Sequence, residues 1–251
     1  MLTKAAGCLV RRAAVALLLL PSLALAGEPL TLRAADGVSV YGTFERAQPH
    51  NRNVILLFHQ ARGNRHEYDP LLPVLHRLGC DTLAIDQRAG GDLFGGHNRT
   101  VEKLGRSTGY LAAMPDLEAA LAWARQRHYG RIVAVGSSYS SALVILLAAR
   151  HPHELAAIAS FSPGEYFDDV NLVKNAAARI AMPFYITTDP DEADNVAAVL
   201  RHAHGGNIVH YRPAFGVHGA STLVQARDPR GYQANLASFA AFLRRVAGSH
   251  D

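Results

Sequence analysis

Continuous apolar runs alternate with helical patterns along most of this chain. The apolar runs have the length of strands buried on both faces, and most are followed by a stretch with apolar residues at helical spacing. The predicted strands cover residues 54–58, 81–85, 131–135, 155–161, 184–188 and 208–211. The predicted helices cover residues 70–78, 138–150, 193–204 and 231–246, and a further helix follows Pro115. This alternation predicts an α/β protein with a right-handed, doubly wound, mostly parallel sheet.

Three other segments complete this plan. Residues 30–34 and 38–44 flank Asp36-Gly37, a pattern that predicts an antiparallel hairpin ahead of the parallel strands. Residues 87–107 are rich in glycine and arginine and predict a long loop. Residues 162–181 are too few for a full cap domain, so we expect a short cap insertion and an open mouth above the strand ends.

Residues 1–26 have the pattern of a secretory signal peptide. Three basic residues precede an apolar run over 13–20, and Ala24-Leu-Ala26 is a small-x-small cleavage site. An uncleaved anchor is the alternative, but the apolar run is shorter than the roughly 20 residues that span a bilayer. We therefore expect cleavage before Gly27, export to the periplasm or the medium, no stable membrane anchor afterwards, and one domain over 27–251.

Removing residues 1–26 changes the charge of the chain. The whole sequence has 25 Lys and Arg residues against 21 Asp and Glu residues, a net charge of +4. Three basic residues and no acidic ones lie in 1–26, which leaves 22 basic and 21 acidic residues in the mature chain. This balance indicates no nucleic-acid or membrane-surface partner. Cys80 is then the only cysteine, so no internal disulfide is expected, and we interpret its thiol as buried.

Residues 131–150 carry the clearest chemical signal. A β-branched run over 132–135 meets Gly136-Ser-Ser-Tyr-Ser140, which opens a long apolar helix. A sharp strand–turn–helix connection of small residues predicts a nucleophile elbow, with Ser138 at its apex. The hydroxyl would lie at a helix N-terminus, where N–H groups stabilise developing negative charge. The alternative is that these serines only cap a helix.

A histidine and a carboxylate that could serve this serine follow later strands. Functional groups in open α/β sheets gather at the carboxyl ends of strands. His218, in Phe215-Gly-Val-His-Gly219, follows the last strand and is the candidate base. Four acidic residues follow the strand at 184–188: Asp189, Asp191, Glu192 and Asp194. Glu192 is the preferred acid and Asp189 the alternative; the order serine, acid, histidine is that of an α/β-hydrolase.

The loop after residues 54–58 is the candidate oxyanion loop. Its sequence is His59-Gln-Ala-Arg-Gly63. The N–H groups of Ala61 and Tyr139 are the predicted oxyanion donors, with Gln60 less favoured than Ala61. We interpret His59 as a residue that organises this loop.

Several residues on the same side are candidates for binding substrate: His59, Gln60, Arg62, Arg65 and Arg88. A guanidinium could hold a substrate carboxylate, or it could pair with Asp86 or Asp92. His202 and His204 could bind a metal, but no carboxylate or third histidine has a suitable spacing to complete the site. We therefore expect neither a metal nor a cofactor.

These residues together resemble the α/β-hydrolase superfamily, and most of all its dienelactone-hydrolase-related and small serine esterase branches. The resemblance covers about residues 30–247 and is carried by residues 57–63, 83–88, 136–140 and 217–219. It implies a serine hydrolase that cleaves a carboxylic ester, or a related acyl bond, of a small molecule through an acyl-enzyme on Ser138. In that family the acid follows at a set distance from a proline before its strand, and the spacing from Pro183 points to Glu192.

The sequence also departs from that family in three places. Dienelactone hydrolases use a cysteine nucleophile where Ser138 stands, so their substrate is not carried over. Ser140 replaces the usual elbow glycine, and the acid would be Glu192 instead of an aspartate. The alternatives to an esterase are a peptidase, a thioesterase and a non-catalytic binding protein on the same fold. The oligomeric state is not predicted.

Overall fold

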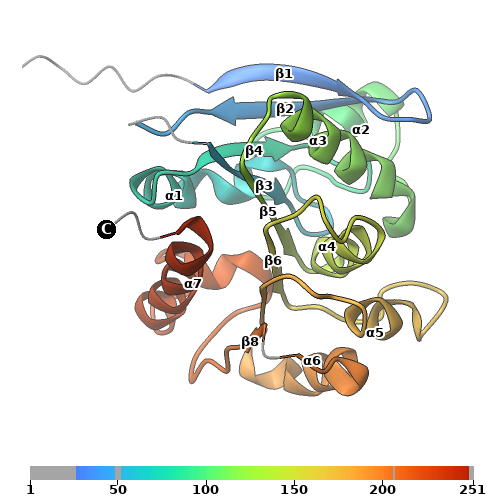
Figure 1. Cartoon of the computed structure of the whole chain (residues 1–251). Coiled ribbons are helices and arrows are strands. Elements are labelled where there is room, and N and C mark those ends of the chain that lie inside the picture. The colour runs from blue at the N-terminus through green and yellow to red at the C-terminus, as the bar shows by residue number, and fades with distance from the viewer. Residues whose placement is uncertain (1–26, 49–51, 206, 249–251) are drawn as a thin grey trace, which may run out of the picture.

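The computed structural model describes residues 27–48, 52–205 and 207–248, and the predicted signal peptide lies outside them. Its strands form an eight-stranded sheet in the order β1-β2-β4-β3-β5-β6-β7-β8 (Figure 1). The strands are β1 (Glu28–Arg33), β2 (Ser39–Glu45), β3 (Asn53–Phe58), β4 (Asp81–Ile85), β5 (Arg131–Ser137), β6 (Ala157–Phe161), β7 (Phe184–Thr187) and β8 (Ile208–His210). β2 pairs antiparallel with β1 and β4, whereas the pairings from β4 through β8 are parallel. The predicted parallel sheet with an N-terminal antiparallel hairpin is confirmed.

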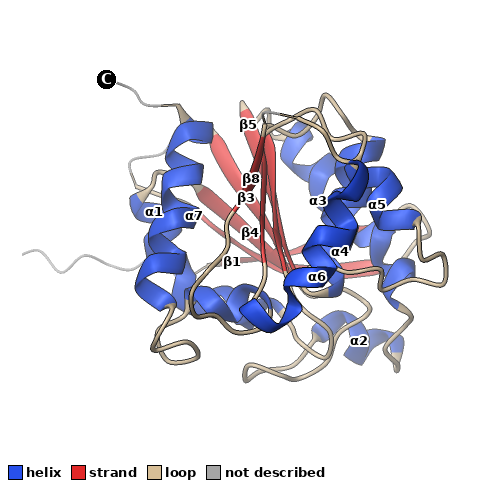
Figure 2. Cartoon of the chain, turned by 90° about the horizontal axis from the view of Figure 1, so that it is seen from below, coloured by secondary structure: helices blue, strands red, loops and turns tan. Residues whose placement is uncertain are grey.

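Helices cover both faces of this sheet. The α-helices are α1 (Leu72–Arg77), α2 (Arg99–Leu104), α3 (Met114–Gln126), α4 (Tyr139–Arg150), α5 (Leu172–Ala177), α6 (Ala193–Val199) and α7 (Tyr232–Ala247). Short 3₁₀ helices are η1 (Arg65–Leu71), η2 (Tyr110–Ala113), η3 (Pro190–Glu192), η4 (Leu200–His202) and η5 (Gly219–Leu223). Figure 2 shows α1 and α7 on one face and α3 to α6 on the other. No helix in the described ranges is both long enough and apolar enough to cross a bilayer.

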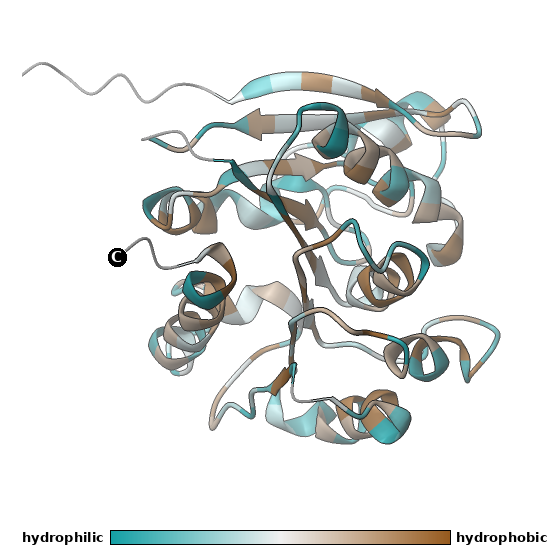
Figure 3. Cartoon of the chain, in the orientation of Figure 1, coloured by the Kyte–Doolittle hydropathy of each residue, from teal (hydrophilic) through white to brown (hydrophobic). Residues whose placement is uncertain are grey.

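The central strands divide their side chains between two cores. Val54, Leu56 and Phe58 of β3 join the core beneath α3 and α4, while Ile55 and Leu57 join the core beneath α1 and α7. Each of these side chains is fully buried, which favours folding by roughly 1.5–3 kcal/mol per side chain. The strands in the middle of the sheet are accordingly mostly brown in Figure 3, whereas α7 carries both colours. Burial on both faces explains why these strands have continuous apolar runs.

Two predicted segments differ from the structure. Residues 87–107, predicted as a loop, contain α2. Asn98 caps this helix by accepting a hydrogen bond from the N–H of Val101, and Gly105 ends it at a φ of 73°. With only six residues, α2 is too short to show a helical period of apolar positions. Only its capping residues could have predicted it from the sequence. The predicted helix 193–204 ends as an α-helix at Val199 and continues as the 3₁₀ helix η4.

The turn between β5 and α4 depends on Gly136. A Cβ at this position would lie 2.2 Å from the backbone oxygen of Ser140, because the first turn of α4 packs directly against the strand. Ser138 follows with a φ of 57° and a ψ of −125°, a conformation that non-glycine residues seldom adopt. The small residues of this turn therefore permit the close approach that holds Ser138 in a strained conformation.

Substituting Gly136 tests this close approach. Gly136→Ala is expected to lower the free energy of unfolding by about 3 kcal/mol, because the added methyl group meets backbone atoms that cannot move independently. Gly109→Ala is the matched control, since a Cβ there meets no atom within 4 Å, and it should change stability by less than about 0.5 kcal/mol. Urea unfolding of the two variants gives the comparison; equal stabilities would contradict the packing described for the turn.

Candidate active site

Ser138 lies at the carboxyl edge of the sheet, between the end of β5 and the start of α4. Its N–H donates a hydrogen bond to the backbone oxygen of Phe161 at 2.8 Å, which fixes the elbow to the end of β6. Ser138 is buried, with 7 % of the residue exposed. Tyr139 is the first residue of α4, and the first N–H groups of a helix have no partner inside it. The elbow therefore presents a hydroxyl beside an N–H group that can bind negative charge.

Ser138, His218 and Glu192 form a continuous chain of hydrogen bonds. His218 Nε2 lies 2.8 Å from Ser138 Oγ, and His218 Nδ1 lies 2.9 Å from both carboxylate oxygens of Glu192. Asp189 has a different task, because its Oδ1 accepts a hydrogen bond from the N–H of Asp191 and caps η3. The preferred acid thus contacts the imidazole, whereas the alternative acid caps a helix. The catalytic roles of these residues remain predictions.

The charges around this chain of hydrogen bonds favour an ionised Glu192. Burial alone would raise the pKa of Glu192, but hydrogen bonds from His218 and from the Thr188 hydroxyl outweigh it and hold the pKa below its usual value. Burial and the neighbouring charge of Glu192 raise the pKa of Asp189. An ionised carboxylate at Nδ1 keeps the proton on that nitrogen and leaves Nε2 free to accept one from Ser138.

The same carboxylates and His218 are close enough to share a cation. Ligand atoms of Asp189, Glu192 and His218 all lie within 4.8 Å of one another, the one such group found in the described residues. Both ring nitrogens of His218 already contact protein side chains, Nδ1 at Glu192 and Nε2 at Ser138. A metal bound by His218 would therefore have to displace one of these hydrogen bonds.

Gly219 allows the histidine loop to lie against the elbow. Its φ is +72°, and a Cβ there would be 2.4 Å from Ser137 Oγ. The N–H of Gly219 donates to Ser162 Oγ, and the N–H of Ala220 donates to Ser137 Oγ, both at 2.9 Å. Two hydroxyls from neighbouring strand ends, Ser162 after β6 and Ser137 on β5, thus hold the loop that carries His218. The role of Ser162 had no signal in the sequence.

The loop after β3 carries the two N–H groups, of Gln60 and Ala61, that were predicted as alternative oxyanion donors. The N–H of Gln60 donates to Glu67 Oε2 at 2.7 Å, so it is occupied. The N–H of Ala61 has no hydrogen-bond partner among the residues that the structure describes. This difference favours Ala61 over Gln60 as the oxyanion donor, in agreement with the order that the sequence suggested.

His59 is a structural residue of this loop. Its ring is fully buried, Nδ1 lies 2.8 Å from the backbone oxygen of Gln60, and Nε2 accepts a hydrogen bond from the N–H of Gln87. Nδ1 therefore carries the proton, and burial lowers the pKa of the ring, which keeps it neutral. The interpretation of His59 as a loop-organising residue agrees with these contacts, whereas the prediction that it binds substrate is wrong because the ring is enclosed.

Ser140, which stands where the family has glycine, ties this loop to the elbow. Its hydroxyl donates to the backbone oxygen of His59 at 2.5 Å and accepts from Gln87 Nε2 at 2.8 Å. Because Ser140 is fully buried, these bonds also satisfy a hydroxyl that would otherwise destabilise the core. The departure from the family pattern is thus compensated inside the fold.

The prediction that Arg88 binds substrate is also wrong. Arg88 is 6 % exposed, and its Nε and Nη2 donate to Asp116 Oδ1 at 2.9 and 2.7 Å. Its other contacts are with Asp36 in the hairpin turn, so it pairs with neither Asp86 nor Asp92. Arg65 does pair with Asp86, the alternative that the sequence left open.

Two of the candidate substrate-binding residues stay available. The side chain of Arg62 is exposed, and Gln60 is partly exposed at the same loop. Arg62 has a φ of 61°, a backbone conformation set by the tight turn after β3. Their contact with a substrate remains a prediction.

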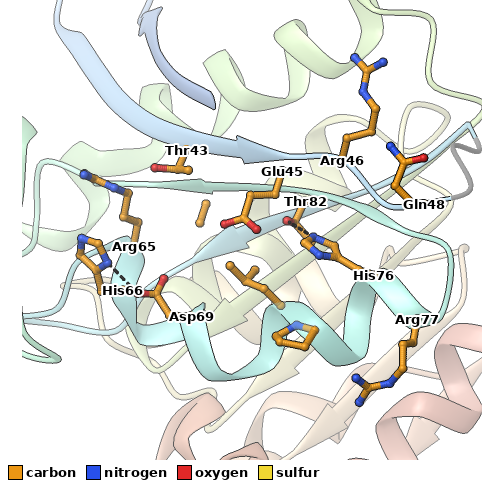
Figure 4. Close-up of a pocket in the computed structure, with 13 residues that line it drawn as sticks. Thr43, Glu45, Arg46, Gln48, Arg65, His66, Asp69, His76, Arg77 and Thr82 are labelled. Atoms are coloured by element: carbon orange, nitrogen blue, oxygen red, sulfur yellow. Dashed lines mark hydrogen bonds and ion pairs between the residues drawn. The ribbon is translucent and has the colours of Figure 1, made fainter. Parts of the chain in front are cut away.

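A separate cavity of about 650 Å³ lies between β2, η1 and α1. Figure 4 shows the carboxylate of Glu45 pointing into it towards Asp69, with His76 bonded to Thr82. Burial, together with the charge of Asp69, raises the pKa of Glu45. None of Ser138, His218 and Glu192 lines this cavity, so it is distinct from the candidate active site.

A serine elbow, a histidine after the last strand and a carboxylate after the strand before it define an α/β-hydrolase. Comparison with family models agrees, because the model of the alpha/beta hydrolase fold matches residues 53–239. The chain belongs to the α/β-hydrolase family. A comparison with curated proteins gave no match.

Solved structures of esterases and hydrolases have the same fold. An esterase from Pyrococcus furiosus is 18 % identical with a TM-score of 0.68, over 89 % of this chain and 94 % of that one. A thermostable carboxyl esterase from Bacillus coagulans is 10 % identical with a TM-score of 0.67, over 89 % and 100 %. A dienelactone hydrolase from Anabaena variabilis is 14 % identical with a TM-score of 0.65, over 88 % and 97 %. The resemblance to the esterase and dienelactone hydrolase branches is confirmed at the level of the fold.

Paired substitutions separate the two acids. Glu192→Gln is expected to lower kcat for an ester by about 10³–10⁴-fold, because an amide in place of the carboxylate can no longer hold the imidazole in the required tautomer. Asp189→Asn should lower kcat by less than about tenfold, since its side chain caps η3 and does not bind the ring. A larger loss in Asp189→Asn than in Glu192→Gln would contradict the assignment.

Arg88 and Arg62 offer a second pair. Arg88→Met is expected to lower the free energy of unfolding by about 3–5 kcal/mol, because Asp116 is left buried without its guanidinium partner. Its KM for esters should stay unchanged. Arg62→Met, on an exposed side chain, should leave stability within about 0.5 kcal/mol of the wild type. Unfolding by urea and steady-state kinetics check both variants, and a raised KM with normal stability in Arg88→Met would restore a role in binding.

Proposed function

We propose that this protein is an exported serine hydrolase that cleaves a carboxylic ester through an acyl-enzyme on Ser138. The observation that carries the proposal is the chain of hydrogen bonds from Ser138 through His218 to Glu192. It begins at a strained elbow where Tyr139 opens α4, and the N–H of Ala61, on the loop bonded to this elbow through Ser140, has no described partner. Such a chain activates a serine hydroxyl that is otherwise a weak nucleophile.

In the first half of the reaction, Ser138 Oγ attacks the ester carbonyl while His218 Nε2 accepts its proton. The carbonyl oxygen becomes negatively charged and accepts hydrogen bonds from the N–H groups of Ala61 and Tyr139. Glu192 stabilises the imidazolium cation through Nδ1. His218 then gives the proton to the leaving alcohol, which leaves the acyl group on Ser138.

In the second half, water replaces the alcohol. His218 accepts a proton from the water as its oxygen attacks the acyl carbonyl, and the same two N–H groups hold the oxyanion. Collapse of the intermediate returns the proton to Ser138 and releases the carboxylic acid. The proton transfers use the hydrogen bonds from Ser138 through His218 to Glu192. The oxyanion uses the N–H of Tyr139, which has no partner inside α4, and the N–H of Ala61, which has no partner among the described residues.

Exposed apolar side chains favour substrates with an apolar or aromatic group. The large hydrophobic residues with the greatest exposure in the described residues are Leu93, Leu104, Tyr110, Leu111, Val170 and Phe215. They lie in connections that follow the carboxyl ends of strands, on the side of the sheet that carries Ser138. The ring of Tyr110 stacks on that of Tyr139, next to the nucleophile, with centroids 4.6 Å apart. An exposed aromatic ring stacked beside the nucleophile suits the acyl or aryl part of a small ester.

Export forms part of the proposal on the strength of residues 1–26. Their basic start, apolar run and small-x-small end are the pattern of a cleaved signal. The mature chain would begin at Gly27. Intact-mass measurement of protein recovered from the periplasm or the medium identifies that terminus.

A fluorophosphonate probe tests the central residue. The wild-type mature chain is expected to gain one adduct, whereas Ser138→Ala should gain none and lose about 10⁴-fold or more in kcat towards aryl and alkyl esters. Ser221→Ala, a partly exposed serine after His218, is the control and should react like the wild type. Folded wild-type protein that forms no adduct would favour a non-catalytic binding protein. Ester turnover that persists in Ser138→Ala would reject Ser138 as the nucleophile.

A further inference from the structure

A buried glutamate that touches none of the reacting groups lies beneath the candidate active site. Glu67 belongs to η1 and is 1 % exposed. Its Oε1 accepts a hydrogen bond from the hydroxyl of Ser137 at 2.7 Å, and its Oε2 accepts one from the N–H of Gln60, also at 2.7 Å. Both donors are neighbours of residues assigned to the reaction: Ser137 precedes Ser138, and Gln60 precedes Ala61.

The Ser137 hydroxyl extends this connection to the histidine loop. While Ser137 Oγ donates to Glu67, it accepts the N–H of Ala220 at 2.9 Å. Ala220 lies two residues after His218. One carboxylate and one hydroxyl therefore connect the three segments that supply the nucleophile, the oxyanion N–H and the base.

Glu67 is itself held firmly in place. Its backbone oxygen accepts a hydrogen bond from Arg227 Nη1 at 2.9 Å. The next residue, Tyr68, is buried, and its hydroxyl donates to the backbone oxygen of Phe58 at the end of β3 at 2.8 Å. The carboxylate is thus held at a fixed position between the loops that it connects.

The number of hydrogen-bond donors around Glu67 matches an ionised carboxylate. Three donors meet in this network: the N–H of Gln60, the O–H of Ser137 and the N–H of Ala220. An ionised carboxylate accepts at both oxygens and so satisfies the first two, while Ser137 Oγ accepts the third. A protonated acid or an amide adds hydrogen at one of these atoms, and one existing donor then loses its acceptor.

Keeping this charge in the core is unfavourable, which argues against a purely structural role. Burial raises the pKa of Glu67 to about 7, although the charges of Arg227 and His218 favour the ionised form. The other titratable groups that face it are the hydroxyls of Tyr68 and Tyr139. Neither hydroxyl can carry a positive charge that would stabilise the carboxylate. On its own helix, His66 and Asp69 bind each other.

We propose that Glu67 is a positioning residue of this hydrolase, whose ionised carboxylate holds the elbow, the oxyanion loop and the histidine loop in the arrangement that the reaction needs. The proposal rests on the proposed function, since it assigns Glu67 to the same site. Glu67 acts through Ser137, Gln60 and Ala220 and does not contact the substrate.

Glu67→Gln tests the proposal, and Asp81→Asn is a matched control. Asp81 is a fully buried carboxylate that accepts an N–H from Ala47 at 2.8 Å and an O–H from Tyr129 at 2.7 Å, the same kinds of donor. It lies at the start of β4, at the sheet edge opposite to Ser138. The readout is the rate at which a fluorophosphonate labels Ser138, which needs no knowledge of the natural ester. Thermal unfolding reports on the fold of both variants.

Labelling of Glu67→Gln is expected to be about 10²-fold slower than that of the wild type, the loss typical of misplaced reacting groups. Labelling of Asp81→Asn should stay within about threefold of the wild type even where both variants unfold at similarly lowered temperatures. Equal labelling rates in Glu67→Gln and wild type would overturn the proposal. An equal loss in both variants would also overturn it, because general destabilisation would then suffice.

The pH dependence is a readout that a structural role would not move. Ionised Glu67 is present above its pKa and is lost as the pH falls through about 7. The labelling rate of the wild type should therefore depend on the ionisation of Glu67, a dependence that Glu67→Gln lacks. A plot of log rate against pH should be steeper below about pH 7 in the wild type than in Glu67→Gln. Equal slopes would contradict the role of the ionised carboxylate.

Ser137→Ala supplies an independent test should Glu67→Gln fail to fold. It removes the hydroxyl between Glu67 and Ala220, fits the small space of the elbow, and should also slow labelling. A wild-type rate in Ser137→Ala would overturn the proposal. Wild-type protein without any adduct on Ser138 would reject the proposed function itself, whereas a labelled wild type with an equally reactive Glu67→Gln would reject only the role of Glu67.

Discussion

The close approach of α4 to β5 at Gly136 is the constraint on which the rest of the site depends. It turns the chain sharply enough to hold Ser138 in a strained conformation at the start of a helix. The ends of two neighbouring strands and the histidine loop are then fixed to this turn by hydrogen bonds. β6 binds it through the Ser138 N–H, β3 through Ser140 and His59, and the histidine loop through Ser137. The small polar residues of the elbow therefore hold the neighbouring loops as well as presenting the nucleophile.

The charged groups near this edge of the sheet differ in whether an opposite charge compensates them. Arg88 with Asp116, and Arg65 with Asp86, compensate one another. Glu67 has no such ion pair at its carboxylate within the described part of the chain, and burial raises its pKa from 4.5 to about 7. The stability associated with this raised pKa is fully present below pH 4.5 and is lost as the pH rises through about 7, a difference of roughly 3 kcal/mol. The ionised form that connects the three loops is thus the form that the fold tolerates least, a balance typical of functional sites.

The sequence was informative where a local pattern carries the chemistry. Ser138 stands in a run of small residues between a strand and a helix, and His218 stands between glycines after the last strand, so both could be named without a structure. The sequence distinguished less clearly between Glu192 and Asp189 as the acid, because the two residues lie only three positions apart. The structure separates them through η3, which uses Asp189 as its cap and brings Glu192 to the imidazole.

Residues that act across the fold left no such pattern. Glu67 meets Ser137 across 70 positions of sequence, and Arg88 meets Asp116 across 28. Neither spacing has a meaning until the strands are ordered, and an arginine on an active-face loop has the same local appearance whether it binds substrate or a buried aspartate. The errors at His59 and Arg88 have this common cause: their position relative to the strand ends was predictable, but their burial was not.

The most direct test of this account is a crystal structure of the protein with a phosphonate bound covalently to Ser138. The phosphoryl oxygen should lie within hydrogen-bond distance, about 2.7–3.1 Å, of the backbone nitrogens of Ala61 and Tyr139. His218 Nε2 should face the leaving-group side, with Nδ1 still bonded to Glu192. A phosphoryl oxygen that points to solvent, or one held by donors other than these two N–H groups, would contradict the arrangement of loops around the elbow on which the proposed reaction depends.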